Sequence, residues 1–111
     1  MKLILLPEAQ RDIISAYEWY ESQKVDLGGE FLSQVKETLR DISRFPESHS
    51  VFHRKVRRAG VQRFPYIVYY RIGADIEVWA VLHGSRHASV WKHRIKAVSY
   101  THLTLPTNSR V

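Results

Sequence analysis

The sequence predicts one α+β domain of order β-α-α-β-β-β, with a helical hairpin packed on one face of an antiparallel sheet. The prediction follows from the spacing of apolar residues, which recur every three or four positions between residues 7 and 45 and every second position between residues 53 and 83. A length of 111 residues suits a single hydrophobic core. The hairpin must cover its apolar face, and a sheet provides the surface that it needs.

Two helices are expected in the first half of the chain. The apolar run at residues 2–6 is short enough for a strand, and Pro7 fits the first turn of a helix because its missing N–H would have no partner there. The apolar spacing predicts one helix over residues 7–20 and another over residues 31–45. The side chain of Phe45 is placed on the buried face, so Phe45→Asp is expected to unfold the domain.

Three strands are expected after the helices, over residues 53–58, 64–72 and 76–83. Residues 73–75 form the loop of a hairpin between the last two strands. The third strand carries apolar side chains on both of its faces, which is typical of a strand inside a sheet rather than at its edge.

The composition excludes several classes of protein. The chain has no cysteine, so a disulfide scaffold, an iron–sulfur centre and a cysteine nucleophile are excluded. Its six histidines lack the spacing of a zinc site, and no glycine-rich phosphate loop is present, so we expect neither a metal nor a cofactor. No apolar run is long enough for a signal peptide or a membrane span, which places the protein in the cytoplasm without membrane contact.

The domain is expected to cover residues 1–96. Residues 85–94 are interpreted as a short closing turn or helix in which Trp91 covers the end of the sheet. Residues 97–111 show neither hydrophobic period, and we expect them to be disordered. The run at residues 98–107 is similar to translated sequencing-adapter DNA, so this tail is interpreted as non-native and carries no functional argument.

Positive charge is concentrated in the second half of the chain. Residues 1–50 carry six basic and nine acidic residues, whereas residues 51–95 carry nine basic and two acidic residues. Seven of these nine are arginine, the side chain best suited to bidentate binding of anions. Because neighbouring strands lie about 4.8 Å apart, the basic side chains of three strands are predicted to form one cationic platform. The alternative is an ordinary solvated surface.

Two chemical uses of this platform are considered. Its cations would bind an acidic protein segment or a nucleic-acid backbone, and the tyrosines of the second strand and Trp79 would offer stacking surfaces, although at least half of these rings are expected in the core. Alternatively, His83 is a general acid or base in RNA cleavage and Arg86 stabilises charge on the phosphate. A loop hydrogen bond for His83 and an ion pair for Arg86 explain the two residues equally well.

Three phrases of the sequence resemble one family. They are RAGVQRFPYIVYYR at residues 58–71, VWAVLHGSR at residues 78–86 and WKHR at residues 91–94. With the prolines that begin the first helix and follow the second, they resemble the ParE branch of the RelE/ParE toxins of type II toxin–antitoxin systems over about residues 2–95. The resemblance implies a RelE/ParE-like fold, a small cytoplasmic toxin that inhibits growth and stabilises plasmids, and no cofactor.

The resemblance also implies partners. A cognate antitoxin would wrap and neutralise the toxin in a hetero-oligomer, and its acidic segment would bind the basic sheet and the exposed apolar edge of the helical hairpin. Members of the ParE branch are associated with poisoning of DNA gyrase by binding, which is the function that we expect. RelE relatives instead cleave mRNA in the ribosome, and a third alternative is an inactive toxin fold that only binds an antitoxin.

Each function assigns its own residues. Partner binding is expected from the platform and from the segment after it, namely from Arg54, Lys55, Arg57, Arg58, Arg71, Trp91 and Arg94. A ribonuclease would use His83, Arg86, Arg63 and Arg57 as its catalytic set. Gly84 stands where a RelE-type ribonuclease would carry an aromatic residue, which weighs against the nuclease and leaves the enzyme question open.

Overall fold

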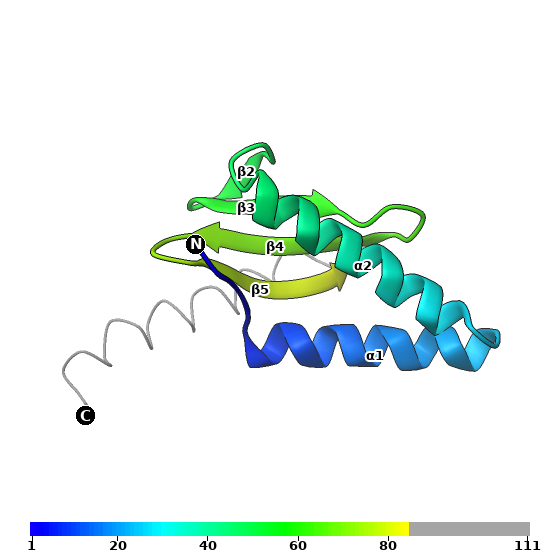
Figure 1. The fold of residues 1–111 in the computed structure, drawn as a ribbon. Coiled ribbons are helices and arrows are strands. Elements are labelled where there is room, and N and C mark those ends of the chain that lie inside the picture. Colours follow the sequence, from blue (N-terminus) through cyan, green and yellow to red (C-terminus); the bar gives the residue numbers. More distant parts are fainter. Residues whose placement is uncertain (85–111) are drawn as a thin grey trace, which may run out of the picture.

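The structure, a computed structural model, describes residues 1–84 and has the predicted α+β fold. In chain order its elements are β1 (Leu3–Leu5), α1 (Pro7–Gln23), α2 (Leu27–Arg44), β2 (Val51–His53), β3 (Val56–Gly60), β4 (Tyr66–Ile72) and β5 (Ile76–His83). The strands form one five-stranded sheet of order β1-β5-β4-β3-β2, and both helices lie on one face of it (Figure 1). Of the helices described, none combines the length and apolarity needed to span a membrane.

The sheet is mixed rather than wholly antiparallel. β1 pairs with β5 in parallel, with Leu3 opposite Ile76 and Leu5 opposite Val78, whereas the other neighbouring strands are antiparallel. β5 lies between β1 and β4, which confirms the internal position predicted for the strand at residues 76–83. The sheet is therefore completed by the first strand of the chain, which the helical hairpin separates from all the others.

The strand predicted over residues 53–58 is in fact two strands. β2 ends at His53 and β3 begins at Val56, so Arg54 and Lys55 form the turn between them. Both residues have positive φ values, 48° and 68°. A two-residue hairpin turn needs such values if its twist is to match the right-handed twist of the flanking strands. Neither glycine nor asparagine marks this turn, so the alternation of residues alone does not reveal it.

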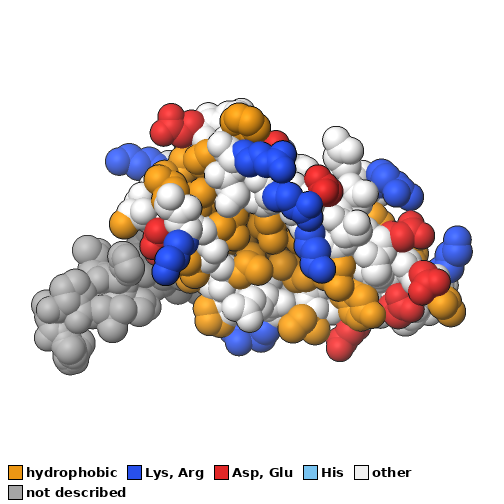
Figure 2. Space-filling view, viewed as in Figure 1, with side chains coloured by type: hydrophobic (Ala, Val, Ile, Leu, Met, Phe, Trp, Pro, Cys, Tyr) orange, Lys and Arg blue, Asp and Glu red, His pale blue; other side chains and the backbone are white. Residues whose placement is uncertain are grey.

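α1 and α2 form the predicted helical hairpin. The carboxylate of Glu21 accepts hydrogen bonds from the backbone N–H groups of Asp26 (3.0 Å) and Gly28 (2.9 Å), and so caps α2 from the preceding helix. Gly28 lets the helices approach closely, because a Cβ at this position would lie 2.8 Å from the ring of Tyr17. Away from their turn the helices diverge, and apolar side chains gather in the space between them (Figure 2).

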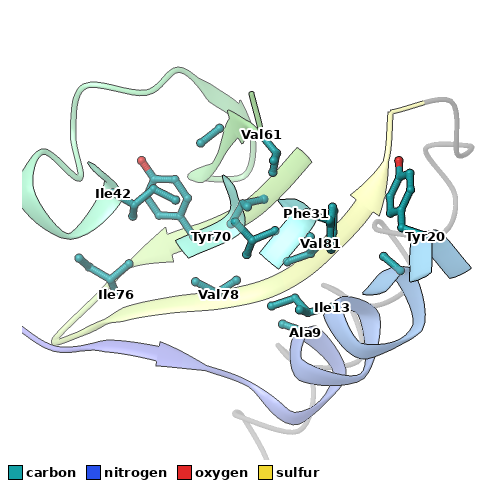
Figure 3. Packing of buried hydrophobic residues seen from close by; sticks show 14 residues of the cluster. Ala9, Ile13, Tyr20, Phe31, Ile42, Val61, Tyr70, Ile76, Val78 and Val81 are labelled. Atoms are coloured by element: carbon teal, nitrogen blue, oxygen red, sulfur yellow. The ribbon is translucent and has the colours of Figure 1, made fainter. Parts of the chain in front are cut away.

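The main core lies between the helices and the sheet (Figure 3). The ring centroid of Phe31 on α2 lies 5.2 Å from that of Tyr20 on α1 and 5.1 Å from that of Tyr66 on β4. Tyr70 is fully buried, and its hydroxyl donates a hydrogen bond of 2.6 Å to the carbonyl of Pro46. Aromatic side chains thus join both helices to the sheet.

Phe45 does not belong to this core. It is the C-cap residue of α2 and is 58% exposed. The placement of Phe45 on the buried face is therefore wrong, and the reason for expecting Phe45→Asp to unfold the domain is lost, because a charge at an exposed position keeps its water. Ile42, three residues earlier, is the fully buried side chain at this end of the helix.

The second face of the sheet is apolar as well. A separate buried cluster on this face contains Val56, Tyr69, Trp79, Ala80 and Leu82, none of which is more than 6% exposed. An irregularity in the β4–β5 pairing between Tyr69 and Tyr70 shifts the register, so the consecutive residues Trp79 and Ala80 both belong to this cluster. The prediction that at least half of the strand aromatics are core residues is confirmed.

Candidate partner-binding surface

Among residues 51–84, the basic side chains do not form one platform. Strand register places Arg58 and Arg71 on the second face of the sheet, whereas Arg57 lies on the face that the helices cover. Arg54 and Lys55 are in the turn between β2 and β3. The predicted platform is therefore corrected to two arginines on one face and two cations at the neighbouring turn.

The two arginines of the second face lie over aromatic rings. The guanidinium carbon of Arg58 is 4.8 Å from the ring centroid of Phe52, and that of Arg71 is 5.3 Å from the ring of Trp79. A guanidinium that interacts with a ring through its positive charge can still donate N–H groups to an anion. Burial raises the pKa of Tyr69, and the positive charge of Arg58 opposes this rise, so the phenol beside Arg58 stays neutral at ordinary pH.

The turn between β2 and β3 presents two cations to solvent. Arg54 and Lys55 are both exposed. A positive φ destabilises a residue other than glycine by about 1 kcal/mol or more, yet both positions carry long basic side chains. The turn therefore holds two exposed positive charges at a corner of the sheet, at positions where glycine would be less strained.

Arg57 instead holds the connection between α2 and β2. Its Nη1 donates hydrogen bonds to the carbonyl oxygens of Glu47 (3.1 Å) and His49 (2.6 Å) in this connection. The hydroxyl of Tyr70 is bonded to the same connection, and burial raises the pKa of Tyr70 to about 12, an effect that Arg57 reduces and Asp41 increases. The guanidinium of Arg57 is thus engaged within the fold.

His83 and Arg63 lie at the other end of the sheet. His83 is opposite Tyr66, with the ring centroids 5.4 Å apart, and Arg63 pairs with Glu30 at 3.4 Å. A hollow of about 570 Å³ beside His83 is lined by Ser15, Ala16, Trp19, Tyr20, Pro65, Tyr66 and His83. Arg57 is turned toward the α2–β2 connection, so the structure does not bring Arg57 together with the other described members of the predicted catalytic set.

Several predicted residues lie outside the described part of the chain. Arg86, Trp91 and Arg94 are among them, as are the closing segment at residues 85–94 and the domain boundary at residue 96. Their roles stay predictions. Within residues 1–84, no group of three or more histidine, aspartate or glutamate side chains could hold a metal ion.

A stripe of basic side chains on α2 is not apparent from the net charge of the first half. Lys36, Arg40 and Arg44 are each four residues apart, so they follow one side of the helix. Figure 2 shows a row of blue side chains on this side of the molecule, beside the orange patch between the helices. The spacing of the three residues is a signal for the stripe, but the excess of acidic residues over positions 1–50 conceals it.

The fold defines a class of small α+β domains in which a helical hairpin packs on one face of a mixed sheet. Residues 3–88 match the family described as ParE toxin of type II toxin–antitoxin system, parDE. This chain belongs to the ParE toxin family. The solved structure of a chromosomal ParDE toxin–antitoxin system from P. aeruginosa shares the fold with a TM-score of 0.58 and 17% identity, over 75% of this chain and 95% of that chain. No curated protein sequence matches the chain.

Proposed function

We propose that this ParE toxin binds DNA gyrase and inhibits it, rather than cleaving RNA. The position of Arg57 is the observation that supports this proposal. A ribonuclease needs its proton-transfer group and its phosphate-binding cations around the same phosphate. Arg57 lies opposite Tyr70, whereas His83 lies opposite Tyr66. The two positions on β4 are four residues apart, so Arg57 and His83 are separated by about 13 Å along the strand direction.

The direction of the side chains adds to this separation. The guanidinium of Arg57 donates to two carbonyl oxygens of the α2–β2 connection, and Arg63 forms an ion pair with Glu30. Both cations therefore have partners of their own within the fold. A toxin that acts by surface contact needs no such convergence, and the family membership of the chain favours gyrase as the protein contacted.

A protein antitoxin is the second partner that we propose. As a toxin of a type II system, the protein would be neutralised by a cognate antitoxin in a hetero-oligomer. An acidic segment of that antitoxin would find exposed cations at Arg54 and Lys55 and stacked guanidinium groups at Arg58 and Arg71. The ordering of a disordered acidic segment on such a surface is a common mode of binding.

Two assays with the full-length protein test the proposed target. In the first, the toxin is added to DNA gyrase, ATP and relaxed plasmid, and we expect loss of supercoiling or trapped double-strand breaks. In the second, it is added to translating ribosomes, and we expect intact mRNA. Codon-positioned cleavage that His83→Ala abolishes would establish the ribonuclease instead, and inactivity in both assays would leave only a toxin fold that binds an antitoxin.

A further inference from the structure

The middle of the chain carries positive charge without any acidic residue. Residues 48–74 contain six basic residues and neither aspartate nor glutamate. α2 differs in this respect, because it carries three basic and three acidic residues. A surface with one sign of charge attracts a ligand of the opposite sign. Among the described residues, the strands that follow α2 are therefore the place to look for an anion-binding surface.

Three cations of this segment are exposed near the corner of the sheet where β2 turns into β3. Arg54 and Lys55 are exposed in the turn, and Arg58 is exposed on β3, about 10 Å from Lys55 along the strand. Within residues 1–84, none of the three has a carboxylate at ion-pair distance. Arg71 differs from them, because Glu77 lies opposite it on β5. We refer to Arg54, Lys55 and Arg58 as the corner cations.

The backbone of the turn indicates that its basic side chains have a use. Arg54 and Lys55 both have positive φ values, and the sequence that best suits such a two-residue turn is Asn-Gly. Strained backbone of this kind occurs mainly at functional sites, where another requirement outweighs stability. Two cations at the two strained positions therefore favour a role in binding over a structural role.

Arg58 is held by an aromatic ring rather than by an acid. Its guanidinium carbon lies 4.8 Å from the ring centroid of Phe52, which in turn lies 5.9 Å from that of Tyr69. A cation–π contact restrains the side chain without cancelling its charge. Less conformational entropy is therefore lost when this guanidinium binds an anion.

We propose that the corner cations bind the phosphate backbone of duplex DNA without sequence specificity. The phosphates of one DNA strand are about 3.4 Å apart along the helix axis, so the distance of about 10 Å between Lys55 and Arg58 corresponds to about three phosphates. The inference rests on the proposed gyrase target, since gyrase acts on duplex DNA, and it adds a direct contact between the toxin and that DNA. An acidic antitoxin segment on the same cations would exclude the DNA.

Fluorescence anisotropy tests the contact in the absence of gyrase. The full-length toxin is titrated into a labelled DNA duplex of about 20 base pairs, at salt concentrations from about 50 to 200 mM. We expect a dissociation constant in the micromolar range at the lowest salt concentration. Because each phosphate contact releases a counterion, three contacts predict that the logarithm of the affinity falls with the logarithm of the salt concentration with a slope of about −3.

A double substitution removes the charges of the turn without straining it. Arg54→Asn with Lys55→Gly is expected to lower the affinity by about tenfold or more and to change the slope to about −1. The midpoint of urea denaturation should equal or exceed that of the wild type, because Asn-Gly suits the turn better. Weaker binding in this variant is thus not a consequence of unfolding.

The matched control removes the same amount of charge from another surface. Arg11→Gln with Lys24→Gln changes exposed residues on α1 and at its C-cap. It should leave the affinity within about threefold and the slope unchanged, because only a long-range effect, which salt screens, is lost. Arg58→Met keeps an unbranched side chain over Phe52 and should reduce the magnitude of the slope by about 1.

The possible outcomes separate this inference from the proposed target. Equal losses of affinity in the turn variant and in the control would overturn the inference, because the net charge rather than the corner cations would then bind the DNA. Tighter binding of an RNA duplex of the same length, or no binding of DNA at the lowest salt concentration, would overturn it as well. A toxin that binds DNA through the corner cations but does not inhibit gyrase would contradict the proposed target and leave the DNA contact established.

Discussion

Tyr70 and Arg57 stand side by side in the sheet and hold the same stretch of chain. Tyr70 donates to the carbonyl of Pro46, and Arg57 donates to the carbonyls of Glu47 and His49. These carbonyl groups lie in an irregular connection between a helix and a strand, where no ladder of backbone hydrogen bonds can satisfy them. One side chain from β3 and one from β4 therefore hold the connection between α2 and β2 in place.

Tyr70 makes the stability of the protein sensitive to alkaline pH. Burial raises its pKa from the ordinary 10 to about 12, so its contribution is complete below pH 10 and is lost as the pH rises to 12. The free energy of unfolding should fall by on the order of 2 to 3 kcal/mol over this range. Urea denaturation at about pH 9 and about pH 12 measures the loss.

Tyr70→Phe separates the phenol from other groups that titrate in this range. The variant should be less stable than the wild type by about 1 kcal/mol near neutral pH, because the hydrogen bond to Pro46 is lost. It should also show a smaller alkaline loss than either the wild type or Tyr17→Phe. An equal alkaline loss in all three proteins would mean that Tyr70 is not the group responsible.

The failure of the platform prediction has a cause that is visible at the residue scale. Arg57 and Arg58 are consecutive in one strand, so their side chains must point to opposite faces of the sheet. Charge counted over a segment contains no such information, whereas the alternation of the strand does. For Arg54 and Lys55 the alternation is misleading, because the chain turns there without a glycine.

Among the elements, α2 depends on a carboxylate from outside itself. Its N-cap residue Asp26 has a left-handed backbone and makes no side-chain capping bond, and the Glu21 carboxylate takes that role. Glu21→Ala should therefore lower the free energy of unfolding by about 1 to 2 kcal/mol, because the N–H groups of Asp26 and Gly28 lose their acceptors.

Glu18→Ala is the matched control, since Glu18 is an exposed acidic residue one turn earlier on the same helix. It should change the stability by less than about 0.5 kcal/mol. Chemical denaturation followed by circular dichroism compares the two variants. Equal stabilities would show that water replaces the carboxylate of Glu21 without loss.

The helices and strands were largely predictable from the sequence, whereas the pairing of the strands was not. Apolar spacing identifies both helices and the strands at β4 and β5, because it reflects which face of each element is buried. The division of residues 53–58 and the parallel pairing of β1 with β5 depend on a turn of unusual composition and on contacts between distant segments. The basic stripe at Lys36, Arg40 and Arg44 could be predicted from the four-residue spacing of these residues, but not from the net charge of residues 1–50.

In the molecule as a whole, the beginning of the chain is tied to β5. The backbone N–H of Ile76 donates to the carbonyl of Lys2 at 2.8 Å, and that of Leu6 donates to Val78 at 3.1 Å. Beyond the end of β1, the carboxylate of Asp12 on α1 accepts a hydrogen bond of 2.9 Å from the N–H of Val81. The edge of β5 is thus covered first by a strand and then by a helix side chain.

Ile4→Pro tests whether this closure belongs to the cooperative fold. Lys2 and Leu6 direct backbone groups to β5, so the N–H of Ile4 between them faces β5 as well, and proline removes it. We expect a loss of about 1 to 3 kcal/mol in urea denaturation. The side chain is 38% exposed, so Ile4→Thr, which keeps the N–H, should be close to the wild type. An unchanged midpoint for Ile4→Pro would mean that the sheet folds without its first strand, and that β5 tolerates an open edge.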